Sequence, residues 1–415
     1  MNILCINHYA GGPAYGMEYR CHYLAREWVR AGHRVTIVGA SQSHVRSRQP
    51  TVSGRFSTET VDGVGFVWCD TPAYSGNGVG RVLNIVTFLR RLGQWRQWLV
   101  EKPDVVIASS TYPADIGPAW RIARRHGATL VWEVHDLWPL SPMELGGMSR
   151  WHPFIIWMQR AENTACRVAD VVVSMLPKAD AHLVDHGMAL AKFFYVPNGI
   201  DPAEWDEAAA AAVTVSAEHT AAIRAARDKG HLLVAYAGAH GLANGLDSVL
   251  DAANLTRSEP VTWLLVGGGP AKAALQQRVA AEKLTNVVML DAVPKTAIPK
   301  LLRAMDVLYI GLQHEPLFRF GISPNKLMDY MMAARPVVCA IDAGNDPVGE
   351  AGCGFTIKPQ APAALADAVR RMLLLPPDER EHMGQAGRAF VEKNHLYAGL
   401  ARRFLDAVGV KRGRT

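Results

Sequence analysis

The sequence predicts an α/β protein with two doubly wound parallel-sheet domains, and three observations predict it. Short apolar runs alternate with amphipathic segments, which is the pattern of strands joined by crossover helices. The alternation restarts after a turn-rich cluster, PNGID, at 197–201. The length of 415 residues suits two domains, at about 100–200 residues per domain.

The first domain is expected to span 1–200. It opens with a strand at 2–8, a glycine-rich turn at 11–16 and a helix at 17–32. Further strands are expected at 34–40, 64–69, 104–109, 128–134, 170–174 and 193–196, with helices near 80–101, 113–126, 152–167 and 177–186.

The second domain is expected to span 201–386, and the segment 387–415 to hold a helix and a basic tail that pack back on the first domain. Strands are expected at 231–239, 262–269, 286–290, 306–312 and 335–341, and helices at 246–254 and 270–284. Open parallel sheets bind ligands at the carboxyl ends of their strands. We therefore expect two Rossmann-like domains that face each other across a cleft, with the informative residues directly after strands.

Composition excludes several classes of protein. Apolar residues make up 49% and charged residues 20%, which is ordinary for a globular chain. The six cysteines form no CxxC pair, so a zinc knuckle or redox motif is disfavoured and a reducing cytoplasm is favoured. No apolar run approaches the roughly 18 residues of a membrane span, and the N-terminus resembles a strand more than a signal peptide. The net charge of +6 suits either an anionic ligand or surface, or plain solubility.

Two candidate sites follow strands of the first domain. Gly12 lies in the turn GGPAYG, where backbone can approach a ligand closely, although a plain tight turn would look the same. The pattern is not GxGxxG, so a nicotinamide dinucleotide is disfavoured. His135 and Asp136 follow the strand at 128–134. His135 can donate to a phosphate or sugar hydroxyl, with Asp136 orienting the imidazole; the alternative is a buried histidine bonded to backbone.

The second domain carries the more specific pattern. Its glycine-rich turns contain Gly238, Gly268 and Gly269, which suit either a phosphate and nucleoside or simply tight helix–strand packing. In GISPNKLMDYMMAARPVV, at 321–338, we expect Ser323 to cap a helix whose first turn holds Asn325 and Lys326. Such a helix start with an ammonium group is an anion site suited to a diphosphate.

Asp329, further along the same helix, can accept from two ribose hydroxyls. The alternative is an ordinary amphipathic helix with a charged face. There is no DxD or HExxH motif, so we expect no metal or other cofactor; helix termini, His135 and Lys326 would instead neutralise the diphosphate.

Two basic, tryptophan-containing stretches suggest contact with an anionic membrane surface. These are 80–100 and 149–160, and such composition is typical of interfacial helices, although core-packed helices also need these apolar residues. The candidate contacts are Arg90, Arg91, Trp95, Trp151, Phe154 and Trp157.

These motifs together resemble the family-4 retaining glycosyltransferases, which have the GT-B fold. The resemblance covers almost the whole chain and is carried by the GGPAYG block, EVHDLWPLS, VPNGID, YAGAHG, LLVGGGP and the block at 321–338. Within the family, the chain looks most like the bacterial cell-surface polysaccharide branch that includes N-acetyl-L-fucosamine transferases of O-antigen and capsule assembly.

The resemblance implies transfer of a sugar, with retention, from a nucleoside-diphosphate sugar, with a uridine-linked donor expected. The acceptor would be a saccharide or a polyprenyl-diphosphate-linked saccharide, handled in the cytoplasm or at the inner membrane face. Gly12 and His135 would close on the phosphate and sugar. Asp329 matches the second glutamate of the family's acidic pair, whereas Gly321 stands where the first would be. The alternatives are a UDP-sugar 2-epimerase of the same fold and a non-catalytic sugar-nucleotide-binding scaffold; no nucleic-acid partner is expected.

Overall fold

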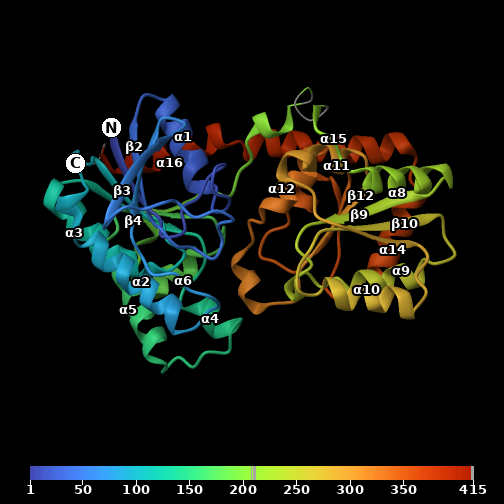
Figure 1. Ribbon diagram of the computed structural model, residues 1–415, viewed down its shortest axis with the longest axis horizontal. Helices are drawn as coiled ribbons and strands as arrows, with labels where there is room; N and C mark the ends of the chain where they lie inside the picture. The colour runs from blue at the N-terminus through green and yellow to red at the C-terminus, as the bar shows by residue number, and fades with distance from the viewer. Residues whose placement is uncertain (207, 209–211, 413–415) are drawn as a thin grey trace. The chain divides into compact units, whose positions relative to one another are not determined.

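The computed structural model describes residues 1–206, 208 and 212–412, and the chain divides into two compact units (Figure 1). Unit 1 comprises Met1–Gly199, the short segment Phe320–Ser323 and the chain from Tyr397 onward. Unit 2 comprises Ile200–Arg319 and Pro324–Leu396. Residues 413–415, the end of the expected basic tail, lie outside the described residues.

Unit 1 is built on an eight-stranded sheet of order β3-β4-β2-β1-β5-β6-β7-β8. All neighbouring strands pair in parallel except β3, which is antiparallel to β4. The strands are β1 (Asn2–Ile6), β2 (Arg34–Ala40), β3 (Phe56–Val61), β4 (Val64–Cys69), β5 (Val105–Ala108), β6 (Thr129–Val134), β7 (Val171–Ser174) and β8 (Phe193–Tyr195). In register, Ile3 lies opposite Val35 on one side and Val105 on the other. The central strands β1 and β5 are almost entirely apolar because helices cover both faces of the sheet.

The helices of unit 1 are α1 (Arg20–Arg30), α2 (Val79–Leu92), α3 (Ile116–His126), α4 (Leu140–Glu144), α5 (Pro153–Val168), α6 (Asp180–Asp185) and α16 (Tyr397–Arg412). The last of them packs against the first. The Trp28 indole donates to the carbonyl of Ala401 at 3.0 Å, and its ring lies 5.1 Å from that of Phe404. Helix α16 therefore completes the core of the first domain.

The single helix expected within 387–415 is in fact parts of two helices. α15 (Pro377–Asn394) belongs to unit 2, and α16 starts at Tyr397 in unit 1. Between them the His395 carbonyl accepts from Ile200 N at 2.8 Å. The return to unit 1 thus begins ten residues later than the expected boundary at 387.

Unit 2 is built on a six-stranded parallel sheet of order β11-β10-β9-β12-β13-β14. Its strands are β9 (Leu232–Ala237), β10 (Val261–Val266), β11 (Val287–Leu290), β12 (Val307–Gly311), β13 (Val337–Ala340) and β14 (Gly354–Thr356). The remaining helices are α8 (Ala217–Asp228), α9 (Asp247–Leu255), α10 (Lys272–Ala281), α11 (Ile298–Arg303), α12 (Asn325–Met332), α13 (Pro347–Ala351) and α14 (Pro362–Leu374). Helices α9, α10 and α14 lie on one face of this sheet, and α8, α11, α12 and α15 on the other (Figure 1).

Candidate functional site

A buried polar network lies at the carboxyl end of β6 in unit 1. Glu133, 2% exposed, accepts from Arg20 Nε at 2.9 Å and from the Ser109 hydroxyl at 2.6 Å. His135 Nε2 lies 2.9 Å from Ser109 Oγ and 3.3 Å from Glu133 Oε2. The fixed carboxylate of Glu133 therefore orients the His135 imidazole, and a catalytic imidazole needs such orientation.

The charges of this network favour a cationic His135. Burial opposes ionisation of Glu133, yet the Arg20 guanidinium and the nearby His135 hold the pKa of Glu133 well below its usual range. Burial would also lower the pKa of His135, but the charge of Glu133 outweighs it and raises that pKa above its usual value. Among the described residues, no hydrogen bond engages His135 Nδ1. Nδ1 of this imidazole is thus left for a ligand, and the raised pKa favours the protonated ring, in which Nδ1 is a donor.

The expected partnership between Asp136 and His135 is wrong. Asp136 Oδ1 instead accepts from Leu137 N at 2.9 Å and from the Ser141 hydroxyl at 2.6 Å, next to α4. The orienting carboxylate is Glu133, which sequence reasoning missed. Side chains two residues apart in an extended chain point to the same side, so the sequence Glu133-Val134-His135 already indicated that Glu133 lies beside His135.

The turn that contains Gly12 is closed by its own backbone. Gly12 N donates to the Gly16 carbonyl at 2.9 Å, and Gly16 N donates back at 2.8 Å. A Cβ atom on Gly12 would lie 3.2 Å from the His22 ring. The tight-turn alternative accounts for these contacts, and a phosphate contact by Gly12 stays a prediction.

In unit 2, Lys326 on α12 is held over the side chain of Tyr236 from β9. Its ammonium donates to the Tyr236 hydroxyl at 2.8 Å and lies 4.3 Å from the ring centroid. Burial lowers the pKa of Lys326 to about 8. A Cβ atom on Gly238 would lie 2.5 Å from Lys326 Nζ, so this glycine makes room for the ammonium. Sequence reasoning named both residues, and the structure brings them together.

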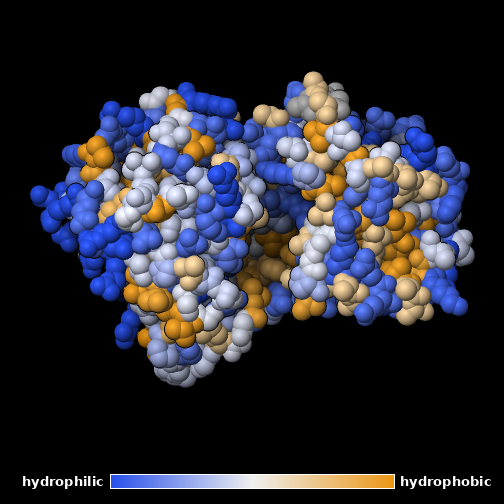
Figure 2. Space-filling model, in the orientation of Figure 1, coloured by the Kyte–Doolittle hydropathy of each residue, from blue (hydrophilic) through white to orange (hydrophobic). Residues whose placement is uncertain are grey.

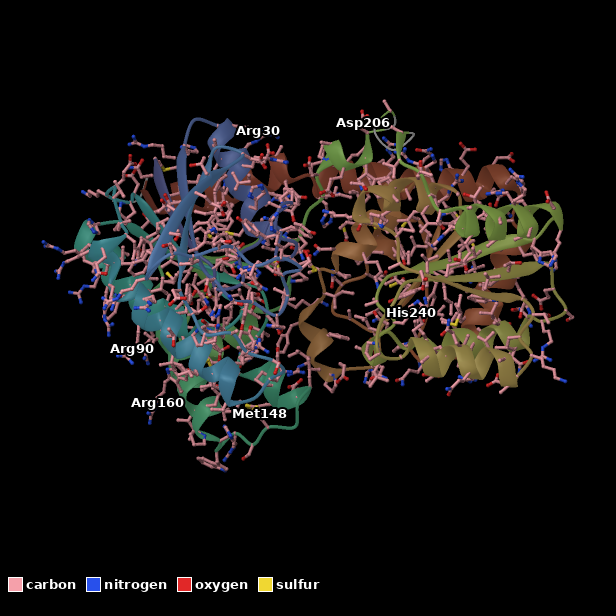
Figure 3. The ribbon with its side chains drawn as sticks, in the orientation of Figure 1. Arg30, Arg90, Met148, Arg160, Asp206 and His240 are labelled. Carbon is pink, nitrogen blue, oxygen red and sulfur yellow. The ribbon has the colours of Figure 1, made fainter. Side chains whose placement is uncertain are left out.

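His240 is a site residue that sequence reasoning missed. It is fully buried in the turn after β9, and Figure 3 labels it inside unit 2. Neither ring nitrogen has a hydrogen-bond partner in the described part of the chain. Burial and the nearby Lys272 and Lys326 lower the pKa of His240, so the ring is neutral near pH 7. Buried polar groups are normally paired, so this histidine marks a place where a ligand would supply the partner.

The glycines after β10 have two different roles. A Cβ atom on Gly267 would lie 1.8 Å from the Gly238 carbonyl, and one on Gly269 would lie 2.7 Å from the His240 carbonyl. These two glycines let the turns after β9 and β10 pack on each other, which is the tight-packing alternative. A Cβ atom on Gly268 would meet open space, so of this run Gly268 is free to contact a nucleoside.

The expected cap by Ser323 is wrong. α12 begins at Asn325, with Pro324 before it and no side-chain cap. The Ser323 hydroxyl accepts from Asn198 N at 2.8 Å, and its carbonyl accepts from Asn198 Nδ2 at 2.7 Å, within unit 1. A residue before proline is pushed to extended backbone, which turns this serine away from the helix start. Asn325 is exposed in the first turn of α12.

Asp329 lies on α12 near Trp205, Glu204 and Lys295. Burial raises the pKa of Asp329 to about 7, with Glu204 adding to the rise and Lys295 and the Trp205 hydrogen bond opposing it. Trp205 lies in the turn Pro202–Trp205 at the start of unit 2. Ribose binding by Asp329 stays a prediction.

Unit 1 also contains a cavity of about 730 Å³ that the sequence did not indicate. The start of α2, the segment around α4 and the start of α5 line it, including Arg81, Asp136, Trp138, Ser141, Leu145 and Phe154. The Arg81 guanidinium lies 5.8 Å from the Trp138 ring centroid, and the rings of Trp138 and Phe154 are 6.0 Å apart. Asp136 thus lines a cavity instead of supporting His135.

The two stretches expected at a membrane are partly core and partly surface. Phe154 and Trp157 pack on a buried cluster, and Trp95 packs edge-on to His126, as the core alternative predicts. Trp151 is 70% exposed and has Arg150 over its ring. Arg90 is also exposed and is labelled at the outer side of unit 1 in Figure 3, whereas Arg91 pairs with Asp70 at 3.7 Å.

Exposed apolar side chains in and beside these two stretches include Val79, Leu83, Val86, Val100, Leu145 and Trp151. Figure 2 shows hydrophobic residues gathered over α2 and α5. In the part of the chain that the structure describes, no helix is long and apolar enough to cross a membrane.

Comparison with known families assigns both units. Residues 15–199 match the Glycosyl transferase 4-like domain, and residues 231–374 match the Glycosyl transferases group 1 domain. The chain is a glycosyltransferase with these two domains. Over 389 residues it is 23% identical to a putative colanic acid biosynthesis glycosyl transferase, WcaI, of Escherichia coli, covering 89% of this chain and 92% of that protein.

Solved structures show the same fold. This glycosyltransferase matches the sucrose-phosphate synthase of Thermosynechococcus elongatus with a TM-score of 0.71 at 16% identity, over the full length of both chains. It matches HepE of Anabaena, solved in complex with UDP-glucose, with a TM-score of 0.64 at 15% identity, over 99% of this chain and all of the other. The fold is therefore GT-B, with two parallel-sheet α/β domains.

Proposed function

We propose that this glycosyltransferase transfers a sugar, with retention of configuration, from a UDP-linked donor to a saccharide or lipid-linked saccharide in bacterial surface polysaccharide synthesis. The colanic acid relative supports the pathway, and the UDP-glucose complex of HepE supports the nucleotide. The observation that carries the proposal is the fully buried, unpaired His240 beside Lys326 at the ends of β9 and β10.

A diphosphate suits this place in unit 2. Lys326 has Tyr236 as its one hydrogen-bond acceptor among the described residues, so two ammonium protons are left for phosphate oxygens. The neutral His240 ring can donate one N–H. Gly268 lies open beside them, and Asn325 offers a further polar group at the start of α12. These groups bind and neutralise a diphosphate without a metal, which is why we propose metal-independent transfer.

Unit 1 supplies a charged donor and an acceptor site. Glu133 raises the pKa of His135, and the protonated ring can stabilise negative charge that develops on a leaving phosphate or a sugar oxygen. Phe154 and Trp138 offer aromatic faces in the 730 Å³ cavity, and Arg81 offers a positive charge. This combination suits a saccharide carried on a polyprenyl diphosphate. The enzyme would then act at the inner face of the membrane.

A thermal-shift screen with UDP, GDP, ADP, CDP and dTDP, each without metal, tests the donor. Selective stabilisation by UDP is the expected result, because a ligand that binds the folded state raises the melting temperature. Stabilisation by none of the five would contradict a diphosphate site at His240 and Lys326.

Product analysis then tests the reaction. With a UDP-sugar and an acceptor extract, we expect a glycoside whose anomeric proton shows retained configuration by NMR. A changed sugar on UDP without any acceptor would indicate the 2-epimerase, and binding without turnover would indicate the scaffold.

A further inference from the structure

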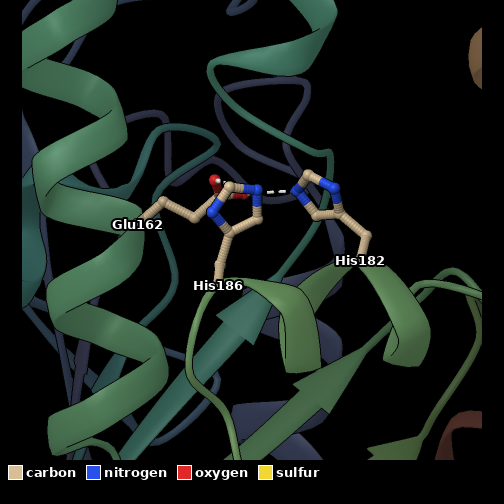
Figure 4. Close-up of side chains that lie close together, drawn as sticks. All are labelled: Glu162, His182 and His186. Atoms are coloured by element: carbon tan, nitrogen blue, oxygen red, sulfur yellow. Dashed lines mark hydrogen bonds and ion pairs between the residues drawn. The ribbon is translucent and has the colours of Figure 1, made fainter.

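Three metal-ligating side chains meet in unit 1, apart from the donor and acceptor residues described above. Glu162 comes from α5, while His182 and His186 lie four residues apart on α6 and at its end. One ligand atom of each lies within 4.8 Å of the other two. Figure 4 shows both imidazoles turned toward the end of the Glu162 side chain.

The hydrogen bonds around Glu162 indicate that His186 Nε2 carries a lone pair and no proton. Gln159 Nε2 donates to Glu162 Oε2 at 2.6 Å and to Asn163 Oδ1 at 2.9 Å, which uses both of its protons. His186 Nδ1 lies 3.2 Å from Gln159 Nε2 and 3.0 Å from Asn163 Oδ1. Because both Gln159 protons are used and an amide oxygen only accepts, His186 Nδ1 is the donor to Asn163. A neutral imidazole that donates from Nδ1 presents a lone pair at Nε2, and this atom lies 4.0 Å from Glu162 Oε2.

A lone pair that faces a carboxylate oxygen is unfavourable unless a proton or a cation lies between them. Metal-binding histidines normally donate their other ring N–H to a carbonyl or carboxylate oxygen, which fixes the tautomer. The Asn163 side-chain oxygen accepts in this way from His186 Nδ1. His182 Nε2, 3.0 Å from Glu162 Oε1, completes the set of ligand atoms.

The dimensions suit zinc. Tetrahedral ligands at about 2.0–2.2 Å from Zn²⁺ lie about 3.4 Å from one another. His182 Nε2 lies 3.0 Å from Glu162 Oε1 and His186 Nε2 lies 4.0 Å from Glu162 Oε2, and one ligand atom of each residue lies within 4.8 Å of the other two. Movements of about an ångström bring the three atoms to the tetrahedral spacing. Two imidazoles and a carboxylate form a borderline ligand set that favours Zn²⁺ over Mg²⁺ or Ca²⁺. Glu162 is 1% exposed, whereas His182 is 13% and His186 27% exposed, so an ion can enter from the α6 side.

We propose that Glu162, His182 and His186 bind one Zn²⁺ ion, with water in the remaining position, and that this ion fastens α6 to α5. The His182 ring packs edge-on to Phe320 at 5.5 Å, at the point where the segment Phe320–Ser323 lies in unit 1. The ion therefore stabilises unit 1 where this segment joins it. The proposal concerns unit 1 alone and leaves metal-free diphosphate binding in unit 2 unchanged.

The test uses the full chain without an affinity tag, treated with EDTA and desalted. Titration with ZnCl₂ by calorimetry is expected to show one saturable site, with a higher melting temperature at saturation. Co²⁺ in place of Zn²⁺ is expected to give the visible absorption of a four-coordinate ion. His186→Ala, at the most exposed ligand, is expected to weaken Zn²⁺ binding at least tenfold while circular dichroism stays that of the folded chain.

Two further variants sharpen the result. Asn163→Ala leaves every ligand in place but removes the acceptor that sets the His186 tautomer, and it is expected to weaken Zn²⁺ about 10- to 100-fold. His382→Ala, at an exposed histidine of α15, is the matched control and is expected to bind as the wild type does. Absence of saturable binding by the folded wild type would overturn the proposal. Equal binding by wild type and His186→Ala would also overturn it, since the ion would then lie elsewhere.

Discussion

Replacing Lys326 by methionine is expected to weaken donor binding and to stabilise the protein at the same time. Lys326 is largely buried over Tyr236, and its ammonium is the charged group nearest to Gly238. Methionine keeps the unbranched stem and removes the charge. The two effects have opposite signs because the buried charge stabilises the bound ligand but destabilises the folded state.

The size of the binding effect follows from the contact that is lost. A hydrogen bond to a charged group contributes about 1.5–3 kcal/mol. This corresponds to a donor dissociation constant about 10- to 150-fold higher in Lys326→Met. The pKa of about 8 adds a pH dependence, since the ammonium of the free enzyme is lost as the pH rises through 8. The affinity of the wild type for UDP is expected to fall above pH 8. The affinity of the variant is expected to show no such fall, because methionine has no proton to lose.

The stability effect follows from the same pKa. Burial lowers the pKa of Lys326 from 10.5 to about 8, which costs the folded state about 3 kcal/mol when the group is charged in both states. The unfolded chain binds more protons between pH 8 and 10.5, so stability should rise across that window. Lys326→Met removes the cost and is expected to raise the free energy of unfolding at pH 7 by about 1–3 kcal/mol.

Calorimetric titration with UDP at pH 7 and pH 9, with urea unfolding at pH 7, measures both effects. Lys358→Met, at an exposed lysine of unit 2, is the matched control and should change neither. A variant that binds UDP as the wild type does would refute the diphosphate role. A variant that loses stability at pH 7 would refute the argument that burial of this charge is unfavourable to the fold.

Three other predictions test the remaining sites. Glu133→Gln removes the charge that raises the pKa of His135, so the loss of turnover with rising pH should begin at lower pH; an unchanged rate–pH profile would contradict the pairing. His240→Phe fills the same space without polar atoms and should weaken UDP by about tenfold with stability kept or raised, whereas unchanged UDP affinity in a thermal-shift series would show that the ring meets no ligand. Trp151→Ser should reduce sedimentation with anionic vesicles at low salt several-fold, and equal sedimentation would remove Trp151 from any membrane contact.

Much of the fold could be predicted from local patterns, and the exceptions have two causes. The buried strands of both sheets are continuous apolar runs, and they were predicted. β3 was missed because it is an antiparallel edge strand whose polar side chains alternate with half-buried ones. The break between α15 and α16 was missed because the helical pattern continues through it. What ends α15 there is the pairing of His395 with Ile200, almost two hundred residues away in the chain.

The candidate site shows the same division. Gly238 and Lys326 were named from their turns and meet as contacts in the structure. Ser323 was given a role as a helix cap that local sequence suggested, but Asn198 binds its hydroxyl instead. The unpaired state of His240 could not be predicted, because it depends on which polar atoms the turns after β9 and β10 place near the ring.

The sequence by itself determined most of the succession of strands and helices, the two-domain organisation and the loops where chemistry was expected. These follow from apolar periodicity and from glycine or proline at turns, which act over a few residues. Only the tertiary structure decided that Arg20 and Ser109 support Glu133, that Glu133 and not Asp136 holds His135, and that α5 and α6 bring Glu162 to two histidines. The physical reason is that buried charges take partners from wherever the packed core places them, and local sequence does not encode that placement.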